Sequence, residues 1–352
     1  MTGNFSRLKT GWFSWLLASL FLWLSACVDE VYLPIRQTAS RLVVDGYITD
    51  EAPPYPIKLT LSGAYSSGGI FPEDLVINGA IATISDDRGQ TVRLEQDPLQ
   101  PAYYWARDPS FRGQINRSYT LRVVLPDGAT YVSSPELLKP VAPIEQVYAE
   151  YKRQATVTKQ PDYYQVMIDT KDPDTPEDYY RWSAYGYVWR WTGTDPQHSS
   201  CNTCSCLVPY YGPLTNVLSD GLVNGNRITG RTVFNSPVYA VGKQYIEVRQ
   251  YSISRAAYQY WKLFDEQRTR TGSLFDPQPA SIEGNVYQKA DTTERALGFF
   301  GASAVSMQRL VIRADTINYN QFLNRYKNTF TPPGECQNNF TSAQFGLAPA
   351  GW

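Results

Sequence analysis

The sequence predicts a mainly β protein: an N-terminal immunoglobulin-like β-sandwich, followed by a larger β-rich domain with one main helix. Three observations favour this fold class. The chain has 352 residues and is rich in strand-forming aromatic residues, with 26 Tyr and 9 Trp. Apolar and polar residues alternate in short segments bounded by Gly, Pro and Asp. Long stretches with helical periodicity are scarce.

In the first domain, six segments carry the strand pattern, and turn signals such as Asp127-Gly128 separate them. This near-regular spacing is typical of an antiparallel sandwich. The chain lacks the Cys…Trp…Cys pattern of antibody domains. The predicted strands are residues 41–48, 55–61, 80–84, 91–94, 119–124 and 130–134.

A proline-marked joint at residues 139–144 starts the second domain. Helical spacing of Ala257, Tyr260, Trp261 and Phe264 predicts the one main helix near 254–267, with Ser254 as its cap. The predicted strands of this domain are residues 147–152, 164–168, 179–191, 238–241, 244–252 and 304–314.

The N-terminal segment is typical of a secretory signal. Arg7 and Lys9 precede an apolar run at residues 12–23, which is too short to span a bilayer comfortably. Residues 24–27 read Leu-Ser-Ala-Cys, which resembles a bacterial lipobox, so we expect lipidation of Cys27. The alternative is a membrane anchor helix followed by an incidental cysteine. The predicted organisation is a signal peptide at 1–26, a lipidated linker at 27–39, the sandwich at 40–142 and the C-terminal domain at 143–352.

Asp29 and Glu30 follow the predicted lipidated cysteine. They resemble the acidic tag that sends lipoproteins of Bacteroidota to the outer face of the outer membrane. An ordinary solvated linker is the alternative interpretation. We therefore expect a protein that is lipid-anchored in the outer membrane and faces the cell exterior.

The charge of the chain excludes one class of partner. Without the signal, 30 Lys and Arg stand against 33 Asp and Glu, a net charge near −3. The charges are interspersed, with no basic run that would neutralise phosphates. We expect no nucleic-acid binding.

Eight segments carry a resemblance to a known family: residues 42–50, 82–89, 111–113, 119–123, 258–262, 275–277, 284–286 and 297–302. They resemble a Bacteroidota outer-membrane lipoprotein family called domain of unknown function 4249. The resemblance covers nearly all of the mature chain, in the right order. It implies an outer-membrane lipoprotein of a kind often encoded beside TonB-dependent transporters, and it implies no reaction and no catalytic residue.

Four cysteines remain after Cys27: Cys201, Cys204, Cys206 and Cys336. With His198, the first three form His-x2-Cys-x2-Cys-x-Cys, a set of potential zinc ligands. These ligands crowd into nine residues, whereas tetrahedral zinc usually draws ligand pairs from separate hairpins. In an oxidising setting we expect disulfides, with Cys336 tied to the cluster and a second bridge inside it. Zinc and free thiols stay open as alternatives.

His198 is the only histidine, and this weighs heavily against most hydrolytic and metal-dependent catalysis. We expect no enzyme, no catalytic residue and no cofactor.

Asp172, Asp174 and Glu177 are the chain's calcium candidates. Their segment lacks the twelve-residue loop with a central glycine, and its prolines indicate a solvated turn.

The aromatic strand at residues 179–191 is the best candidate for a binding surface. Strand alternation places its odd-numbered residues on one face, where tyrosine and tryptophan would suit a glycan or a partner protein. The loop at 192–214 adds two more tyrosines. In the alternative interpretation, the other sheet and the helix with Trp261 cover both faces. The candidates are Tyr185, Tyr187, Trp189, Trp191, Tyr210 and Tyr211.

Together these features predict a non-enzymatic accessory subunit of a TonB-dependent transporter, which captures a glycan or peptide ligand or acts as a lid. This expectation rests on the TonB-dependent transporters beside which members of the resembled family are often encoded. A free-standing glycan-binding or adhesion lipoprotein is the first alternative, and a surface hydrolase is the second.

Overall fold

The fold comes from a computed structural model of the chain. The structure describes residues 40–63, 75–155, 160–193, 204–213, 215–269, 282–313, 318–326, 331–345, 348–349 and 352. The predictions for the signal peptide, for Cys27 and for the linker lie outside these residues. Among the described residues, no helix is long and apolar enough to cross a membrane.

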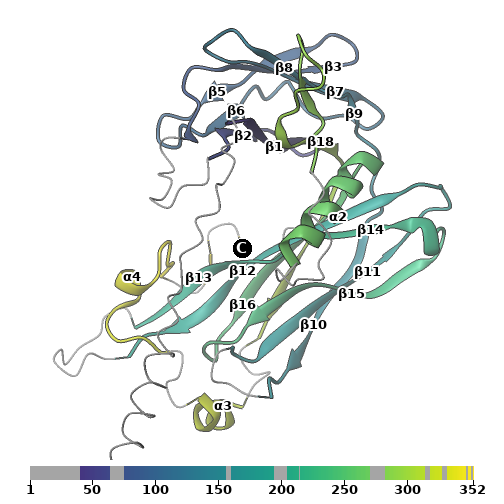
Figure 1. Cartoon of the computed structure of the whole chain (residues 1–352). Coiled ribbons are helices and arrows are strands. Elements are labelled where there is room, and N and C mark those ends of the chain that lie inside the picture. The colour runs from purple at the N-terminus through teal and green to yellow at the C-terminus, as the bar shows by residue number, and fades with distance from the viewer. Residues whose placement is uncertain are drawn as a thin grey trace, which may run out of the picture. The chain divides into compact units, whose positions relative to one another are not determined.

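The protein is mainly β, as predicted, and its strands form two sandwiches (Figure 1). In the first sandwich, one sheet has the order β18-β1-β2-β6-β5 and the other the order β17-β8-β7-β3-β4, with β9 paired to β7. The first sheet consists of β1 (Leu42–Thr49), β2 (Tyr55–Leu61), β5 (Glu95–Gln96), β6 (Tyr103–Ala106) and β18 (Leu297–Ser303). The second consists of β3 (Ile81–Asp86), β4 (Thr91–Arg93), β7 (Ser118–Val124), β8 (Thr130–Ser133), β9 (Glu136–Leu137) and β17 (Val286–Gln288).

Alternation in the strands builds the core of this sandwich. In β2, Ile57 and Leu59 are fully buried, whereas Lys58 between them is exposed. They share one hydrophobic cluster with Ile84 and Leu121 of the opposite sheet. Inward-facing residues of two sheets thus pack together, which is the arrangement that the sequence pattern predicts.

The first sandwich is completed by a segment from far along the chain. Strand β18 pairs in parallel with β1, and β17 pairs antiparallel with β8. Phe300 of β18 is fully buried in the core of the first sandwich. The predicted boundaries at 40–142 and 143–352 therefore miss part of the first sandwich. The physical reason is that a parallel pair needs a long crossover, which local patterns along the chain do not reveal.

The second sandwich has a three-stranded sheet, β10-β11-β15, and a sheet of order β13-β12-β16-β19 in which β14 also pairs with β12. Its core joins Val166 and Phe234 of the smaller sheet to Trp182 and Ile246 of the larger one. The strands are β10 (Ile144–Lys152), β11 (Tyr163–Lys171), β12 (Tyr179–Trp191), β13 (Ser205–Tyr211), β14 (Asn216–Ser219), β15 (Arg227–Pro237), β16 (Gln244–Ser252) and β19 (Val305–Ile312).

The main helix, α2 (Arg255–Thr269), forms where it was predicted. The Ser254 hydroxyl caps its first turn by accepting a hydrogen bond from the Ala257 amide at 3.1 Å. Its aromatic side packs on β18, with the rings of Tyr260 and Phe299 at 5.4 Å. The other described helices are short: the 3₁₀ helix η2 (Asp220–Leu222), α3 (Tyr319–Tyr326) and α4 (Cys336–Asn339).

Two local predictions for the second domain are wrong. The segment at 238–241 is a bend, and the strand lies before it, as β15. Strand β15 contains Gly230, and its pairing with β11 has two register shifts, so its burial does not alternate as a strand pattern would. The predicted loop at 192–214 contains β13, which pairs with β12.

Candidate functional site

Strand β12 carries the candidate surface, and its two faces differ as predicted. From Tyr179 to Val188, buried and half-buried residues alternate strictly. The buried set includes Tyr180 and Trp182 of the core. The half-buried set includes Tyr185 and Tyr187, which point away from the core of the second sandwich.

Tyr185 and Tyr187 meet a third tyrosine from the neighbouring strand. Tyr211 of β13 lies opposite Tyr185, and both Tyr187 and Tyr211 place their ring centres 6.3 Å from that of Tyr185. Tyr211 is 71% exposed. The Gln344 amide donates a hydrogen bond of 3.3 Å to the Tyr187 hydroxyl. Burial, and secondly the charge of Glu247, raise the pKa of Tyr185, which keeps its hydroxyl protonated.

Strands β16 and β19 extend this face. Glu247 pairs with Tyr185 on one side and with Arg309 on the other, so the three side chains lie in one row. Met307 and Val311 flank Arg309 on β19, and both are exposed. We call this surface the open sheet face; it consists of Tyr185, Tyr187, Tyr211, Glu247, Met307, Arg309 and Val311.

The charged side chains on the open sheet face form ion pairs with one another. The Glu247 carboxylate is 1% exposed and accepts hydrogen bonds from Arg249 Nε at 2.8 Å and from Arg309 Nε at 3.0 Å. Arg249 also bonds Glu51, which follows β1, at 2.7 Å. Burial by itself lowers the pKa of Arg249. The hydrogen bond to Glu247 and the neighbouring charges raise it further than burial lowers it, so the pKa lies above its ordinary value. The face therefore presents apolar and aromatic area with paired charges.

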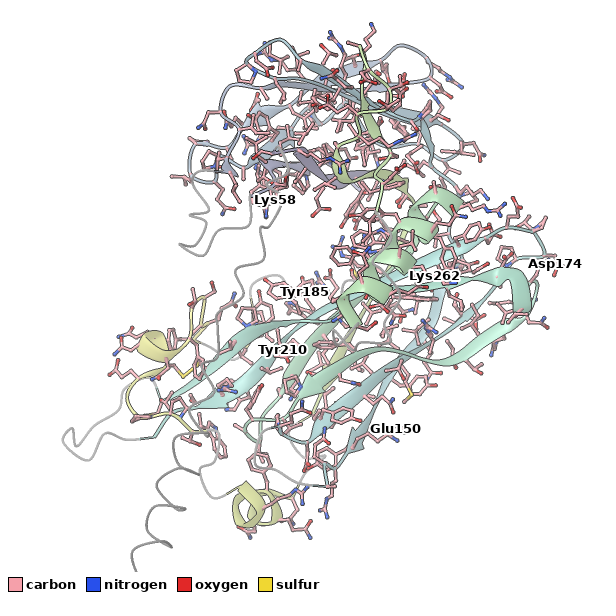
Figure 2. All side chains as sticks on the ribbon, viewed as in Figure 1. Lys58, Glu150, Asp174, Tyr185, Tyr210 and Lys262 are labelled. Atoms are coloured by element: carbon pink, nitrogen blue, oxygen red, sulfur yellow. A yellow bond between two sulfur atoms is a disulfide. The ribbon has the colours of Figure 1, made fainter. Side chains whose placement is uncertain are left out.

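The structure does not bring all six predicted surface residues together. Tyr210 precedes Tyr211 on β13, so the two side chains point to opposite sides of the strand. Tyr210 contacts Phe234, with ring centres 6.0 Å apart. Figure 2 labels Tyr210 and Tyr185. Trp189 is half-buried and lies so close to Gly242 that a β-carbon there would be 2.4 Å from its ring. Trp191 meets Phe322 of α3 at 6.3 Å.

Helix α2 also covers one end of the odd-numbered side of β12. The Arg181 guanidinium lies 4.2 Å from the centre of the Trp261 ring, and Tyr179 contacts Tyr258 at 5.2 Å. The alternative interpretation, in which the helix covers this face, thus holds for residues near Arg181. It does not hold for Tyr185, in the middle of β12, or for Tyr211 of β13.

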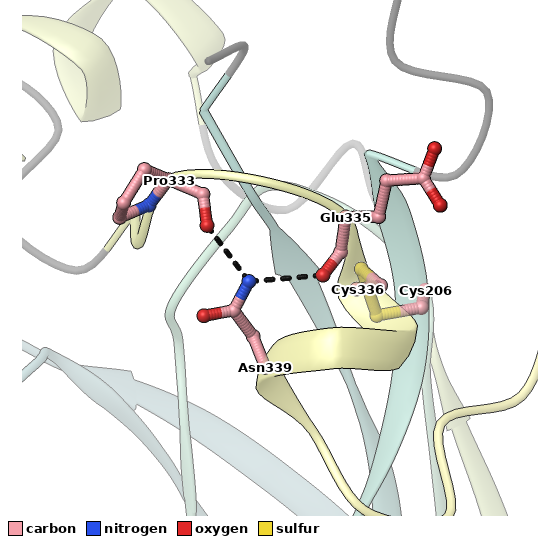
Figure 3. Close-up of a disulfide and its surroundings, with 5 residues drawn as sticks. All are labelled: Cys206, Pro333, Glu335, Cys336 and Asn339. Atoms are coloured by element: carbon pink, nitrogen blue, oxygen red, sulfur yellow. Dashed lines mark hydrogen bonds between the residues drawn. A yellow bond between two sulfur atoms is a disulfide. The ribbon is translucent and has the colours of Figure 1, made fainter.

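A disulfide joins Cys206 of β13 to Cys336 at the start of α4 (Figure 3). Cys204 is a disulfide cysteine as well, whereas Cys201 and His198 lie outside the described residues. A sulfur held in a disulfide is not a thiolate ligand, so the disulfides remove Cys204 and Cys206 from the zinc alternative.

The segment around Cys336 is held by further bonds. The Asn339 amide donates to the carbonyls of Pro333 at 2.8 Å and Glu335 at 2.9 Å (Figure 3). The backbone of Gln344 exchanges two hydrogen bonds with Leu207 of β13. The C-terminal segment therefore covers part of the outer edge of β13, and it leaves Tyr211 exposed at the strand's end.

The calcium candidates do not gather into one site. Asp172 is fully buried and accepts hydrogen bonds from the Tyr180 hydroxyl and the Gly225 amide, whereas Asp174 and Glu177 are exposed. Burial raises the pKa of Asp172. In the described part of the chain, no three His, Cys, Asp or Glu residues are placed to hold a metal ion.

Sequence reasoning missed two features near the surface. One is the ion-pair network of Glu247, Arg249 and Arg309. The spacing Glu-x-Arg in the predicted strand at 244–252 indicated part of this network, because residues two apart on a strand share a face. The other is a groove of about 350 Å³ beside Tyr210. Its far wall belongs to β15, which the sequence pattern did not predict.

Comparisons with known proteins give a family and distant structural neighbours. The family model described as "Domain of unknown function (DUF4249)" matches residues 28–309. No curated protein matches the chain. A protein of the DUF4785 family from Legionella pneumophila aligns at 10% identity and a TM-score of 0.21, over 60% of this chain and 52% of its own, so the match spans about half of that protein. The chicken interferon gamma receptor alpha chain aligns at 7% identity and a TM-score of 0.20, over 61% of this chain and 90% of its own.

Proposed function

The chain belongs to the family designated domain of unknown function 4249, and from this premise we propose that it is a non-enzymatic accessory subunit of a TonB-dependent outer-membrane transporter. A lipid on Cys27 anchors the folded body in the outer membrane, facing the exterior. The body captures ligand, or acts as a lid, beside the transporter. Tethering raises the effective concentration of the bound ligand at the pore.

One observation carries the proposal, namely the composition of the open sheet face. It combines exposed Tyr211, Met307 and Val311 with charges that are already paired. Aromatic residues and Met are enriched in protein interfaces, where unpaired charges are depleted. Exposed side chains of these types are available to contact a protein partner. The open sheet face thus fits a protein partner such as the transporter barrel.

The proposal that the protein is non-enzymatic rests on its single histidine. The single histidine, His198, leaves no pair of imidazoles for a metal, and a hydrolytic triad would depend on that one loop residue. Loss of function after replacement of one carboxylate, with folding and binding intact, would instead support the surface hydrolase.

The proposal is tested by isolating the tagged lipoprotein from its native outer membrane in mild detergent and identifying its partners by mass spectrometry. We expect a TonB-dependent barrel in stoichiometric amount. Absence of any barrel contradicts the proposal and favours a free-standing glycan-binding or adhesion lipoprotein.

A second variant tests the anchor separately. Replacing Cys27 by Ser removes the acylation site without touching either sandwich. We expect Cys27→Ser to leave the outer-membrane fraction while folding normally. If this variant stays in the membrane as fully as the unmodified chain, lipidation at Cys27 is not the anchor.

A further inference from the structure

The groove beside Tyr210 has two walls, one from each sheet of the second sandwich. The end of β13 provides one wall and β15 the other, and the hollow measures about 350 Å³. Small-ligand sites typically span about 300 to 1,000 Å³. Its lining includes Tyr210, Tyr211, Asn216, Thr232, Phe234 and Asn235.

A β-bulge places a buried aromatic ring behind Tyr210 in this groove. On β15, Thr232 pairs with Met167 and Phe234 pairs with Val166, so Val233 is an extra residue between them. The bulge lets consecutive Val233 and Phe234 both turn inward and become buried. Phe234 then lies 6.0 Å from the ring of Tyr210, which is 38% exposed at the groove.

The backbone approaches its neighbours closely at Gly212, which lines the groove. A β-carbon at Gly212 would lie 3.0 Å from both the Ala184 carbonyl and the Phe234 ring. The amide of Gly212 instead donates to that carbonyl at 2.7 Å. The tyrosines that precede Gly212 are thereby fixed relative to Phe234.

The polar groups of the groove are neutral and can both donate and accept. The Asn235 side chain is exposed and makes no hydrogen bond to the described residues. The Thr232 hydroxyl accepts from the Gln165 amide at 2.9 Å, which leaves its own proton for an outside acceptor. No charged side chain is among the described residues that line the groove. An ionic ligand would therefore find no counter-charge there.

From this lining we propose that the groove binds a neutral saccharide. The exposed rings of Tyr210 and Tyr211 suit the C–H faces of sugar rings. Amide and hydroxyl groups match sugar hydroxyls, which also donate and accept. Tyr210 lies across β13 from the open sheet face, and Tyr211 borders both surfaces. The inference stands whether or not the protein serves a transporter. A proline-rich peptide also suits aromatic grooves, and it is the competing ligand.

The test is isothermal titration of the full mature lipoprotein, in detergent, with neutral gluco-, manno-, xylo- and galacto-configured oligosaccharides and with a polyproline peptide. We expect at least one oligosaccharide to bind, and Tyr210→Ala to weaken that binding by about tenfold or more. Asn235→Ala changes an exposed side chain, so it keeps the fold and should weaken binding about fivefold. Met307→Ala, on β19 and outside the lining of the groove, is the control and should bind as the unmodified chain does.

Three results would overturn the inference. The first is that no oligosaccharide of the panel binds. The second is that only the polyproline peptide binds. The third is that Tyr210→Ala and Asn235→Ala bind as tightly as the unmodified chain. None of these results bears on whether a transporter barrel is isolated with the lipoprotein, so failure here is distinct from failure of the proposed function.

Discussion

Tyr211 lies opposite Tyr185 on the neighbouring strand, and the centres of the two rings are 6.3 Å apart. Tyr185 is half-buried among polar partners, whereas Tyr211 is 71% exposed. The inner ring therefore supports the outer one, and the outer ring extends the open sheet face toward solvent. This arrangement separates a residue that stabilises the fold from one that is available for binding.

We expect the two tyrosines to differ in their contribution to stability. Tyr211→Ser should lower the free energy of unfolding by about 1 kcal/mol or less, because the lost ring contact is exposed. Tyr185→Ser should lower it by about 2 kcal/mol or more, because it removes a half-buried ring beside Glu247. Urea unfolding measures both, and equal losses would contradict this division of roles.

The ion pairs of Arg249 predict unequal effects of two substitutions. Glu51→Gln should cost about 1 kcal/mol or less, since that pair is about one-third exposed. Arg249→Met should cost about 2 to 3 kcal/mol, because it also takes a partner from Glu247, which is 1% exposed. Denaturant unfolding in low salt compares the two variants.

A double-mutant cycle is the control for that comparison. The coupling between Glu51 and Arg249 should be about 0.5 to 1 kcal/mol and should shrink in high salt. A coupling of zero would mean that this pair does not help to hold β16 to the segment that follows β1.

Glu136 of β9 predicts a pH dependence of stability. It is 4% exposed, and its burial raises its pKa from 4.5 to about 7, against hydrogen bonds from Ser254 and Asn285 that lower it. A carboxyl group whose pKa is higher in the folded state than in the unfolded state stabilises the fold when the pH is below its unfolded-state pKa. This contribution is lost as the pH rises from about 4.5 to about 7.

Glu136→Gln removes that titration and keeps an acceptor for Asn285, which donates to Glu136 Oε1 at 3.1 Å. At pH 8 the variant should be more stable than the unmodified chain by up to about 3 kcal/mol, and at pH 4 the difference should vanish. Unfolding measured across this range checks the prediction. Parallel pH profiles for the two proteins would show that Glu136 is not the group responsible.

The disulfide between Cys206 and Cys336 spans 130 residues and ties the C-terminal segment to β13. Replacing both cysteines by Ser should lower the free energy of unfolding by up to about 5 kcal/mol, because a long loop is released in the unfolded chain. A reducing agent should lower the melting temperature of the unmodified chain more than that of the double variant. Equal shifts would place the effect of reduction at another cysteine.

Local patterns predicted most of the strands because burial in them alternates. Strand β12 is the clearest case, with an alternation that runs from Tyr179 to Val188 and identifies both faces. Helix α2 was predicted as well, since Ser254 caps it and Ala257, Tyr260 and Trp261 share a side. In these elements, local sequence and tertiary packing favour the same structure.

Long-range pairing could not be predicted from such patterns. Gly298 has a φ of +85°, and a β-carbon there would lie 1.9 Å from the Val44 carbonyl. That glycine lets β18 approach β1, but its sequence neighbourhood does not reveal a partner more than 250 positions earlier. The same limit applies to the Tyr210 groove, whose two walls come from different sheets and depend on a bulge at Val233.

The most direct test of the proposed function compares the unmodified lipoprotein with Tyr211→Ser, both isolated from the native outer membrane. Leu222→Ser is the matched control, because Leu222 is 99% exposed and lies in η2, away from the open sheet face. The account predicts that a TonB-dependent barrel accompanies the unmodified chain and the control in stoichiometric amount, and that Tyr211→Ser reduces its recovery about tenfold. Recovery of no barrel with the unmodified chain, or equal recovery with all three proteins, would contradict the account.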